Sequence, residues 1–596
     1  MQLRHLSIPH FRNLRDFAIN FSTHFPLGDG ESMGSTGKLI RSHALIGQNG
    51  TGKSNLIEAL ITIFRDIDLN RDAAFDYTLE YEIRGHTVRI QADRTRQKHP
   101  FVWVDGDRVP QDYLTKNDSP NKVEQDTRRG PRLLPTHIFT YYSGRNERIE
   151  LLFQEHQRRF NRRQEIVAEE VLPPELLRGF TGSEADIRAI EGAKKRGQSR
   201  MQQLGADRLR RLFYCRGGHS QLVLLACLLS DDPVFQKVLR NLHIEALESA
   251  LFVLKEPHRL REKRRGGKFD QNELNEGDPR FWYARGNVVS EFLDKLWQVA
   301  WAPIEQEATK QIDFRGRTEK QKQLYLFVPS HDKLKQLGEL VGGTDSFFRY
   351  AEGAYIGDLI DEVRITVKKR DEHGGKVSFI QLSEGELQIL TVLGLMRITR
   401  EDHCLFLLDE PDTHLNPIWK LRYFDDIEGI LSANAGALVQ GESQILITTH
   451  DPMMVGSLKR EQVHILRRED NRTVVDTPDE DPQGMGVSGL LKSDLFGLRS
   501  TVDSETLRRL DRRNYLFAKG NERTSEENNE LARLSDELSD LGFAKDFKDP
   551  YYALFVSKMA RHTKFHKETL TPAEQQEQDA IADAIIDEIL REEKTV

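Results

Sequence analysis

The chain has 596 residues, of which 30% are charged and 38% hydrophobic, and its formal net charge is -8 at pH 7. A chain of this length exceeds what one hydrophobic core usually serves, so the sequence predicts a globular protein of two to four domains. The acidic balance excludes a general attraction to nucleic acid and leaves only local basic patches as candidates for such contacts.

The cysteines and the apolar segments bear on the compartment. Cys215, Cys227 and Cys404 lack metal-site spacing and lie in apolar surroundings, which predicts buried thiols in a reducing cytoplasm. The N-terminus has no continuous apolar region of the signal-peptide type, and no run of about 18 apolar residues predicts a membrane span. We therefore expect a cytoplasmic protein without a membrane partner.

The N-terminal part of the sequence predicts a hairpin, then a long loop rich in glycine and then further strands. Alternating apolar residues over 1–21 turn at Phe11–Asn13 and predict the hairpin. Residues 22–38 predict an unusually long loop. Further strands are expected over 77–83, 87–91, 101–109 and 135–142.

The stretch from Gly47 to Ser54 has the pattern Gly-x-x-x-x-Gly-Lys-Ser of a phosphate-binding loop. A short apolar strand, Ala44–Ile46, precedes it, and helical spacing of apolar residues follows it. In such a loop Lys53 reaches the β- and γ-phosphates of a nucleotide and Ser54 holds Mg²⁺, at the positive end of a helix. The other residues expected at the nucleotide are Gly47, Asn49, Gly50, Thr51, Gly52 and Asn55.

The middle of the chain predicts mostly helix. A charged helical stretch runs from 147 to about 202 and is broken at Pro173-Pro174, and a buried helix is expected over 206–229. Residues 257–279 are the least core-like and predict a mobile loop. A helix over 288–301 and a strand over 324–328 follow.

The last third predicts strands and then helices. Strands are expected over 363–368, 377–382, 403–408, 444–449 and 463–466, and strand character is expected to end there. Residues 503–596 predict mainly helix, with a capping box and a first-turn proline at Thr571–Glu574. Ile581, Ile585 and Ile589 line one face of this last helix, as a docked helix requires.

Two carboxylates end the apolar strand that precedes Pro411. A nucleotide hydrolase needs acids at such a strand end, because Asp409 can hold Mg²⁺ and Glu410 can orient and deprotonate the attacking water. Paired acids at a strand end can also be a solvated turn, and the phosphate-binding loop favours the catalytic interpretation.

Two further segments complete the pattern. Ser383, Gly385 and Glu386 open a helix, which alone indicates only a well-capped start. His450 follows another apolar strand, where a histidine is often structural. In the order loop, Ser-Gly segment, Asp-Glu pair and histidine, these residues resemble the ATPase heads of the SMC, RecF and OLD ABC group. The resemblance covers about 1–145 and 340–470.

The resemblance implies an α/β P-loop NTPase of ABC-ATPase head type, with two lobes and a mixed sheet flanked by helices. It implies that Ser383 and Gly385 bind the γ-phosphate of a nucleotide held by a partner subunit, that His450 senses this phosphate, and that Arg12 helps bind the nucleotide. The cofactors are then ATP and Mg²⁺, and the heads dimerise or form a higher oligomer around ATP. The expected division is an N-terminal lobe (1–146), a mainly helical insertion with a mobile basic loop (147–340), a C-terminal lobe (341–475) and a helical, partner-docking region (476–596).

The chain departs from the group in two places. Members usually carry a glutamine at the end of the strand that here ends at Tyr142, so either Ser143 or Gln154 takes its role or the coupling differs. Asn416 replaces the acid found in many of the corresponding loops.

The separation of the two head segments helps to choose among members of the group. Lys53 and Ser383 lie 383 - 53 = 330 residues apart, but the insertion has neither the heptads nor the Cys-x-x-Cys hook of an SMC coiled coil. A Toprim nuclease is not indicated, because Lys519 stands where an acid would be needed, and His-Asn-His spacing is absent. The remaining resemblance is to stand-alone ATPases of anti-phage systems, such as PtuA of Septu systems and of some retrons, or restriction-system-associated AAA-type ATPases.

This resemblance implies a separate His-Asn-His nuclease of PtuB type as a partner, regulated by an ATPase that does not itself cut nucleic acid. Basic clusters at 158–163, 194–196 and 259–268 are either solvated faces or a surface for the phosphate backbone of nucleic acid. Two alternatives remain open: a RecF- or SMC-like ATPase of DNA repair or recombination, and a nucleotide-locked scaffold without useful turnover.

Overall fold

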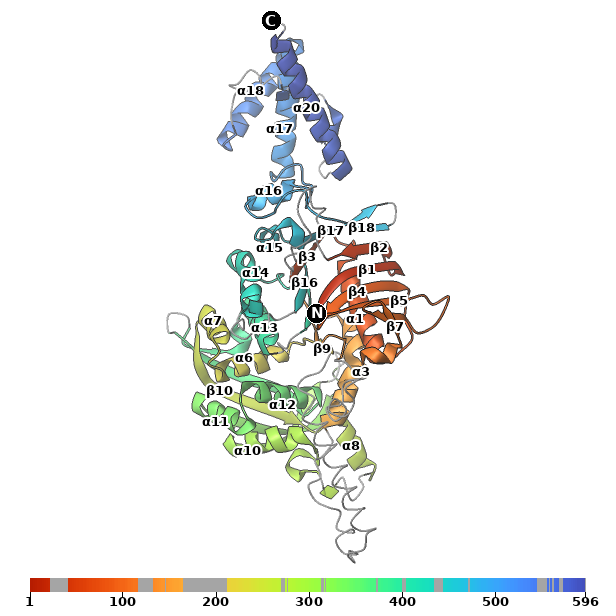
Figure 1. The fold of residues 1–596 in the computed structure, drawn as a ribbon. Helices are drawn as coiled ribbons and strands as arrows, with labels where there is room; N and C mark the ends of the chain where they lie inside the picture. The colour runs from red at the N-terminus through yellow and green to blue at the C-terminus, as the bar shows by residue number, and fades with distance from the viewer. Residues whose placement is uncertain are drawn as a thin grey trace, which may run out of the picture. The chain divides into compact units, whose positions relative to one another are not determined.

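The helices and strands of the computed structural model are shown in Figure 1. The described residues are 1–21, 41–115, 132–144, 146–164, 212–268, 274–275, 277–311, 316, 318–370, 374–398, 403–432, 443–469, 472–543, 555–556, 558–559, 562–566 and 572–594. They form two compact units, one of Met1–Thr449 with Leu466–Val475 and the other of His450–Ile465 with Asp476–Val596.

A seven-stranded sheet carries the predicted phosphate-binding strand. Its order is β18-β17-β3-β16-β15-β8-β9, in which the last five strands are parallel neighbours. These five are β3 (Ser42–Ile46), β16 (Gln444–Thr448), β15 (Leu405–Asp409), β8 (Ile138–Tyr142) and β9 (Leu212–Tyr214). Every residue of β3, β15 and β16 is buried, as apolar runs in a parallel sheet covered on both faces require. Their carboxyl ends meet at one edge, where the predicted site residues follow them.

The outer strands of this sheet correct one prediction. Strand character was expected to end at residue 466, but β17 (Val463–Glu469) continues past it and β18 (Arg472–Asp476) follows. The charged residues Arg467, Arg468 and Glu469 do not have the apolar pattern of a central strand, so the end of β17 was not predicted. A strand toward the edge of a sheet tolerates such side chains.

A six-stranded antiparallel sheet confirms the predicted hairpin and the strands after it. Its order is β2-β1-β4-β5-β6-β7. The strands are β2 (Leu14–Asn20), β1 (Gln2–Phe11), β4 (Tyr77–Ile83), β5 (His86–Ala92), β6 (Phe101–Val104) and β7 (Asp107–Val109). One apolar cluster joins this sheet to α1 (Lys53–Asp68) and to the seven-stranded sheet. Leu56, Leu60 and Phe64 of α1 are buried in it, so the helix that follows the phosphate-binding loop is held between two sheets.

A five-stranded antiparallel sheet lies partly within the segment 147–340, which was expected to be mainly helical. Its order is β11-β12-β10-β13-β14. The strands are β11 (Trp301–Gln311), β12 (Thr318–Val328), β10 (Ile244–Lys255), β13 (Ile360–Lys369) and β14 (Lys376–Ser378). Only the end of β12 was expected from the sequence of this segment. Since β10 pairs with β13 over its whole length, the sheet extends beyond residue 340.

Ten helices of the first unit cover or connect these sheets. They are α1, α3 (Glu147–Gln164), α6 (His219–Leu229), α7 (Pro233–Asn241), α8 (His258–Arg265), α10 (Asp294–Val299), α11 (His331–Val341), α12 (Thr344–Ile356), α13 (Glu384–Ile398) and α14 (Pro417–Ser432), counted over the described ranges. α10, α11 and α12 lie against the five-stranded sheet (Figure 1). α13 packs on α6, where the Thr391 hydroxyl donates to Ser220 Oγ over 2.7 Å.

Two predicted boundaries in this region are wrong. The helix expected over 206–229 begins only at His219, because residues 212–214 form β9. The loop expected from residue 257 begins as helix α8. Two arginines of α8 form ion pairs with acids on other segments: Arg261 with Glu319 and Arg264 with Glu256. These acids offset the repulsion among the positive charges of the helix. Pro173-Pro174 and the cluster 194–196 lie outside the described residues.

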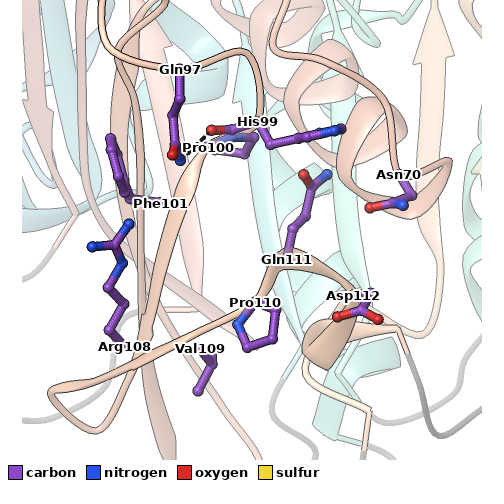
Figure 2. A pocket seen from close by; sticks show the side chains of 10 residues that line it. All are labelled: Asn70, Gln97, His99, Pro100, Phe101, Arg108, Val109, Pro110, Gln111 and Asp112. Carbon is purple, nitrogen blue, oxygen red and sulfur yellow. Dashed lines mark hydrogen bonds between the residues drawn. The ribbon is translucent and has the colours of Figure 1, made fainter.

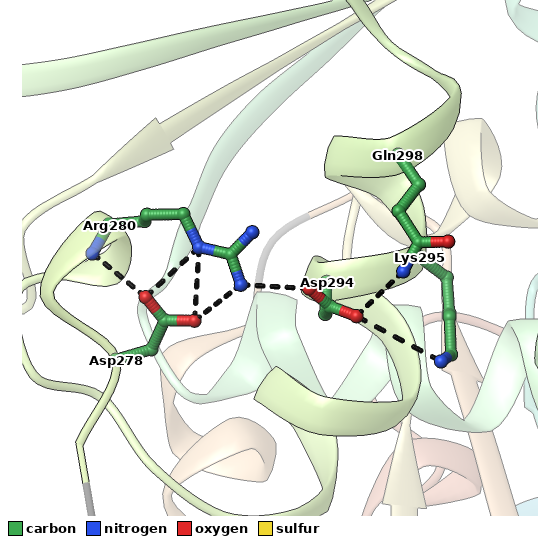
Figure 3. A network of polar contacts seen from close by, with 5 residues as sticks. All are labelled: Asp278, Arg280, Asp294, Lys295 and Gln298. Atoms are coloured by element: carbon green, nitrogen blue, oxygen red, sulfur yellow. Dashed lines mark hydrogen bonds and ion pairs between the residues drawn. The ribbon is translucent and has the colours of Figure 1, made fainter.

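Figure 3 shows the polar network that joins a short turn, η2 (Pro279–Phe281), to α10. Arg280 forms ion pairs with Asp278 over 2.7 Å and with Asp294 over 2.8 Å. Its guanidinium also lies 5.4 Å from the centre of the Phe281 ring and 5.3 Å from that of Trp297. The hydrogen bond to Asp278, then that to Asp294, raises the pKa of Arg280. The network therefore joins η2 to the first residue of α10.

The second unit is mainly helical, as predicted. Its longer helices are α16 (Gly486–Lys492), α17 (Ser504–Ala518), α18 (Ser525–Asp540) and α20 (Pro572–Lys594), after the short α15 (Pro452–Val455). Ile585 and Ile589 of α20 are buried, whereas Thr571 lies outside the described residues. Within the described part of the chain no helix is long and apolar enough to cross a membrane. The three cysteines are buried thiols, as predicted, and none of them forms a disulfide within the described residues.

Candidate functional site

The phosphate-binding loop follows β3 and needs glycine at three positions. Gly47, Gly50 and Gly52 have φ values of 155°, 86° and 108°, and residues with a side chain rarely adopt such values. A Cβ atom on Gly47 would lie 2.4 Å from the Leu466 carbonyl oxygen, and one on Gly52 would lie 2.5 Å from Leu14 Cδ2. The loop is therefore packed against β17 on one side and against the β1–β2 hairpin on the other.

Lys53 begins α1 and folds back over the loop. Its Nζ donates to the carbonyl oxygens of Gly47 over 2.6 Å and Gln48 over 3.3 Å. Burial lowers the pKa of Lys53, while the nearby charges of Glu410 and Asp409 act in the opposite direction. The Lys53 ammonium is partly desolvated, and its hydrogen bonds go to neutral carbonyl oxygens. It can exchange them for bonds to a phosphate, because the full negative charge of a phosphate makes it a stronger acceptor.

Asp409, the last residue of β15, is 1% exposed and has the environment of a cation ligand. Thr448 donates to its Oδ1, the Ser54 hydroxyl lies close enough to lower the pKa of the same carboxyl group, and among the described residues Oδ2 is buried without a hydrogen-bond partner. Burial raises the pKa of Asp409, against the effect of these donors. An open buried carboxylate oxygen beside a hydroxyl fits Mg²⁺, which takes one or two protein ligands together with phosphates and water. No larger group of His, Cys, Asp and Glu that could hold a metal occurs among the described residues.

Glu410 leaves the strand in a left-handed conformation, with φ of 48°. Its N–H donates to the Thr448 carbonyl oxygen over 3.1 Å and to the Thr448 hydroxyl over 3.0 Å. These bonds hold a backbone that a residue other than glycine adopts at a cost. The half-buried Glu410 side chain is thereby turned out of the strand beside Asp409. The next loop is fixed by the Thr449 hydroxyl, which donates to buried Asp412 over 2.8 Å.

The roles of Thr448 and Tyr142 were missed by sequence reasoning, although these residues end β16 and β8, the two strands that flank β15. Tyr142 is the register partner of Asp409 on β8. Burial, then the charges of Asp409 and Glu410, raises the pKa of Tyr142, and Asn146 hydrogen bonds to it. Tyr142 thus lies at the strand end where members of the resembled group usually carry a glutamine, and Asn146 contacts it there.

Ser143 and Gln154, the two residues proposed for that glutamine role, lie in different parts of the structure. Ser143 contacts the site through its backbone, since its N–H donates to the Asp409 carbonyl oxygen over 3.1 Å. Gln154 lies within α3.

Arg12 and Asn55 were expected to contact the nucleotide, and both are engaged elsewhere. Arg12 pairs with buried Glu58 of α1 over 2.6 Å, a carboxylate that Arg148 also contacts over 3.1 Å. Asn55 Nδ2 donates to Asn13 Oδ1 over 2.5 Å. These contacts brace the N-terminal part of α1. The contact of Arg12 and Asn55 with the nucleotide stays a prediction, since Arg12 is exposed and its guanidinium has further N–H donors.

Asn13, which the sequence did not single out, makes the direct contact to the loop. It lies in the β1–β2 turn, and its Nδ2 donates to the Gly50 carbonyl oxygen over 2.6 Å. Asn49 and Gly50 are exposed at the tip of this loop, while Thr51 is buried and donates to the Gln48 carbonyl oxygen over 2.9 Å.

The Ser-Gly segment forms a capped helix start next to a pocket. The Ser383 N–H donates to the Glu386 carboxylate over 2.8 Å, and the Glu386 N–H donates to Ser383 Oγ over 3.2 Å. Lys369 pairs with Glu386 over 2.8 Å. Burial acts to raise the pKa of Glu386, but the Lys369 bond and the Ser383 N–H outweigh it, and this pKa lies below its ordinary value.

The pocket has a volume of about 570 Å³ and is lined by Ser383, Glu384, Gly385, Glu386, His414, Asn416 and Trp419. A Cβ atom on Gly385 would lie 2.5 Å from the His414 carbonyl oxygen. The structure therefore brings the Ser-Gly segment against the loop that follows the Asp-Glu pair. His450 directly follows Thr449, is exposed and belongs to the second unit, so its role toward a γ-phosphate stays a prediction.

Comparison with known proteins supports the coarse assignment. Residues 251–455 match a family model described as "AAA domain, putative AbiEii toxin, Type IV TA system". No curated protein sequence matches the chain. Among solved structures, the SMC head domain from Thermotoga maritima has 11% identity and a TM-score of 0.27, covering 80% of this chain and 99% of that chain.

A Bacillus cereus protein related to NIF3 has 9% identity and a TM-score of 0.09, covering 56% of this chain and 94% of that chain. At these scores neither solved structure adds to the assignment, which follows from the parallel strands, the loop after β3 and the acids after β15. The first unit has the α/β fold of a P-loop NTPase of ABC-ATPase head type.

Proposed function

We propose that the chain binds ATP with Mg²⁺ and hydrolyses it. The observation that carries this proposal is the buried Asp409 Oδ2, an acceptor without a partner beside the Ser54 hydroxyl. In this proposal the N–H groups of Gly50 to Ser54 and the Lys53 ammonium hold the phosphates, and Ser54 and Asp409 hold the metal. When bound, Mg²⁺ supplies Lewis-acid stabilisation of charge on the phosphate oxygens.

Glu410 is the proposed general base. Its carboxylate is half-buried at the end of β15, next to the metal ligand and turned by its left-handed backbone toward the edge where the loop lies. There it can orient a water molecule and accept its proton. Thr448 positions this residue, because both of its oxygen atoms accept from the Glu410 N–H.

We further propose that the active form is a dimer in which Lys53 of one subunit and Ser383 of the other flank one ATP. Three apolar side chains support this arrangement. Ile380 is 85% exposed, Ile418 64% and Leu421 46%, and they lie on the segments that border the Ser383 pocket. Exposed apolar side chains grouped around a functional segment are typical of a protein interface.

The partner proposal rests on the resemblance to anti-phage ATPases. In it, ATP binding or hydrolysis regulates a separate His-Asn-His nuclease of PtuB type, which docks on the helical region 476–596. A contact to nucleic acid through the basic insertion is supported by Arg265 and Lys268, exposed at the end of α8, although Arg261 and Arg264 of that helix are used in ion pairs.

ATP turnover by purified protein tests the ATPase proposal. Wild-type protein should release phosphate in a Mg²⁺-dependent reaction, Lys53→Ala should bind ATP poorly, and Glu410→Gln should bind ATP but release phosphate at least about a hundredfold more slowly. Turnover by Glu410→Gln at the wild-type rate would show that the base is another residue. Co-purification from the native operon, with identification of the bound protein, tests the nuclease partner.

A further inference from the structure

A second pocket lies at the β7 edge of the six-stranded sheet, away from the phosphate-binding loop. It has a volume of about 570 Å³, and its walls come from the end of α1, from β6 and β7 and from η1 (Gln111–Leu114). Figure 2 shows Phe101 and Arg108 on one wall, Asn70 on the opposite wall and Gln111 between them. Nothing in the proposed ATPase reaction uses these residues.

Gln111 is the first sign of a missing ligand. Its side chain is 8% exposed, and its Oε1 has no hydrogen-bond partner in the described part of the chain. Its Nε2 donates to the Arg71 carbonyl oxygen over 3.4 Å, which fixes the orientation of the amide. A buried acceptor without a donor is destabilising. Gln111 lines the pocket, and a ligand N–H satisfies this oxygen once the amide turns toward the pocket.

Arg108 is the second sign. Its guanidinium carbon lies 4.6 Å from the centre of the Phe101 ring, and across the described residues it forms no ion pair. The Trp103 ring centre lies 6.1 Å from that of Phe101, and Arg89 lies 5.7 Å from the centre of the Trp103 ring. Phe101 and Trp103 alternate on β6, so both face away from the apolar core. The Phe101 and Trp103 rings are tilted by 34° to each other. At the pocket, the Arg108 guanidinium lies over the Phe101 ring and offers a positive charge that is in no ion pair within the described part of the chain.

We propose that this pocket binds a nucleobase with its phosphate, either a base of single-stranded nucleic acid or a free mononucleotide. The base stacks on the Arg108–Phe101 pair and donates an amino or imino N–H to Gln111 Oε1. The Arg108 guanidinium neutralises the adjoining phosphate. Aromatic rings and arginine planes are the surfaces on which proteins stack unpaired bases, and a pocket of this volume accommodates one nucleotide. The inference does not rest on the proposed ATPase activity.

Binding is measured with the full chain carrying Lys53→Ala, so that the phosphate-binding loop does not contribute. The probes are a fluorescein-labelled single-stranded oligodeoxyadenylate, followed by anisotropy, and AMP as competitor. Gln111→Leu and Arg108→Ala should each weaken binding about tenfold. Arg96→Ala is the matched control, because Arg96 is an exposed arginine outside the pocket that pairs with Asp93 over 3.0 Å. It should bind within about twofold of the parent.

The outcomes separate the two sources of ligand. Binding of the oligonucleotide that AMP does not displace assigns the pocket to a nucleic-acid strand, and displacement by AMP assigns it to a free nucleotide. Absence of binding by either probe, or equal weakening by Arg96→Ala and Arg108→Ala, overturns the proposal. If Gln111→Leu does not fold, Arg108→Ala decides alone, since Arg108 stands on the exposed face of β7. This result does not depend on whether the protein hydrolyses ATP, because binding is measured with the Lys53→Ala chain.

Discussion

The contact between Asn13 and the phosphate-binding loop predicts that Asn13→Ala weakens ATP binding. The substitution removes the hydrogen bond to the Gly50 carbonyl oxygen at 2.6 Å and the bond from Asn55 at 2.5 Å. Neither Asn13 nor the loop tip is deeply buried, so each bond contributes about 0.5–1 kcal/mol. Together they correspond to about a five- to thirtyfold increase in the Kd for ATP.

Calorimetric titration with ATP measures this change, and Asn20→Ala is the control. Asn20 lies in the same hairpin and hydrogen bonds to His5 over 2.6 Å without a contact to the loop. The control should bind ATP as the wild type does, and both variants should unfold within about 3 °C of it. If Asn13→Ala keeps wild-type affinity, or if Asn20→Ala loses as much, the hairpin does not hold the loop in the way described.

Three further predictions concern glycines and one acid. Gly52→Ala should lose ATP binding and about 2 kcal/mol or more of stability, because its Cβ would lie 2.5 Å from a leucine side chain, whereas Gly50→Ala, with open space around it, should cost about 1 kcal/mol; calorimetry and thermal unfolding compare them. Gly385→Ala, whose Cβ would lie 2.5 Å from a carbonyl oxygen, should keep ATP binding by the monomer but lose the ATP-dependent dimer in light scattering, and Gly429→Ala, in open space, should keep both. Burial raises the pKa of Asp409, so the stability linked to its proton is present at acid pH and lost as pH rises through that pKa. Asp409→Asn should therefore raise Tm near pH 7 by about 2 °C while removing Mg²⁺-dependent turnover, and a lower Tm with intact turnover would contradict the burial argument.

The parallel sheet and its loop could be predicted because their residues carry short-range signals. β3, β15 and β16 are continuous apolar runs, and each is followed directly by residues that are proposed to act at the strand end. Where strands, turns and chemistry follow one another along the chain, sequence order is enough to place them.

β11 was missed for a physical reason. It is an edge strand without apolar alternation, and it exposes Trp301 and Ile304. Its only signal was pairing with β12, a long-range contact that no window of sequence contains. α8 was missed for the same reason, since the acids that neutralise its arginines lie on other segments.

The bracing residues of the site also required the structure. Asn13 lies 37 residues before the oxygen it binds, and Thr448 lies 39 residues after the carboxylate it contacts. Both residue types are common in turns and strand ends, so only spatial proximity identifies their role. The sequence predicts the groups that are proposed to contact ATP, and the structure adds the groups that hold them in place.

Complementation between two inactive variants tests whether Lys53 and Ser383 of different subunits serve one ATP. Lys53→Ala chains and Ser383→Arg chains, each purified and inactive alone, are mixed, and phosphate release is measured. An equimolar mixture should recover about a quarter of wild-type turnover, because half of the dimers are mixed and each mixed dimer has one of its two sites intact. If the mixture stays as inactive as its components, or if Ser383→Arg alone turns over ATP normally, the composite site is contradicted.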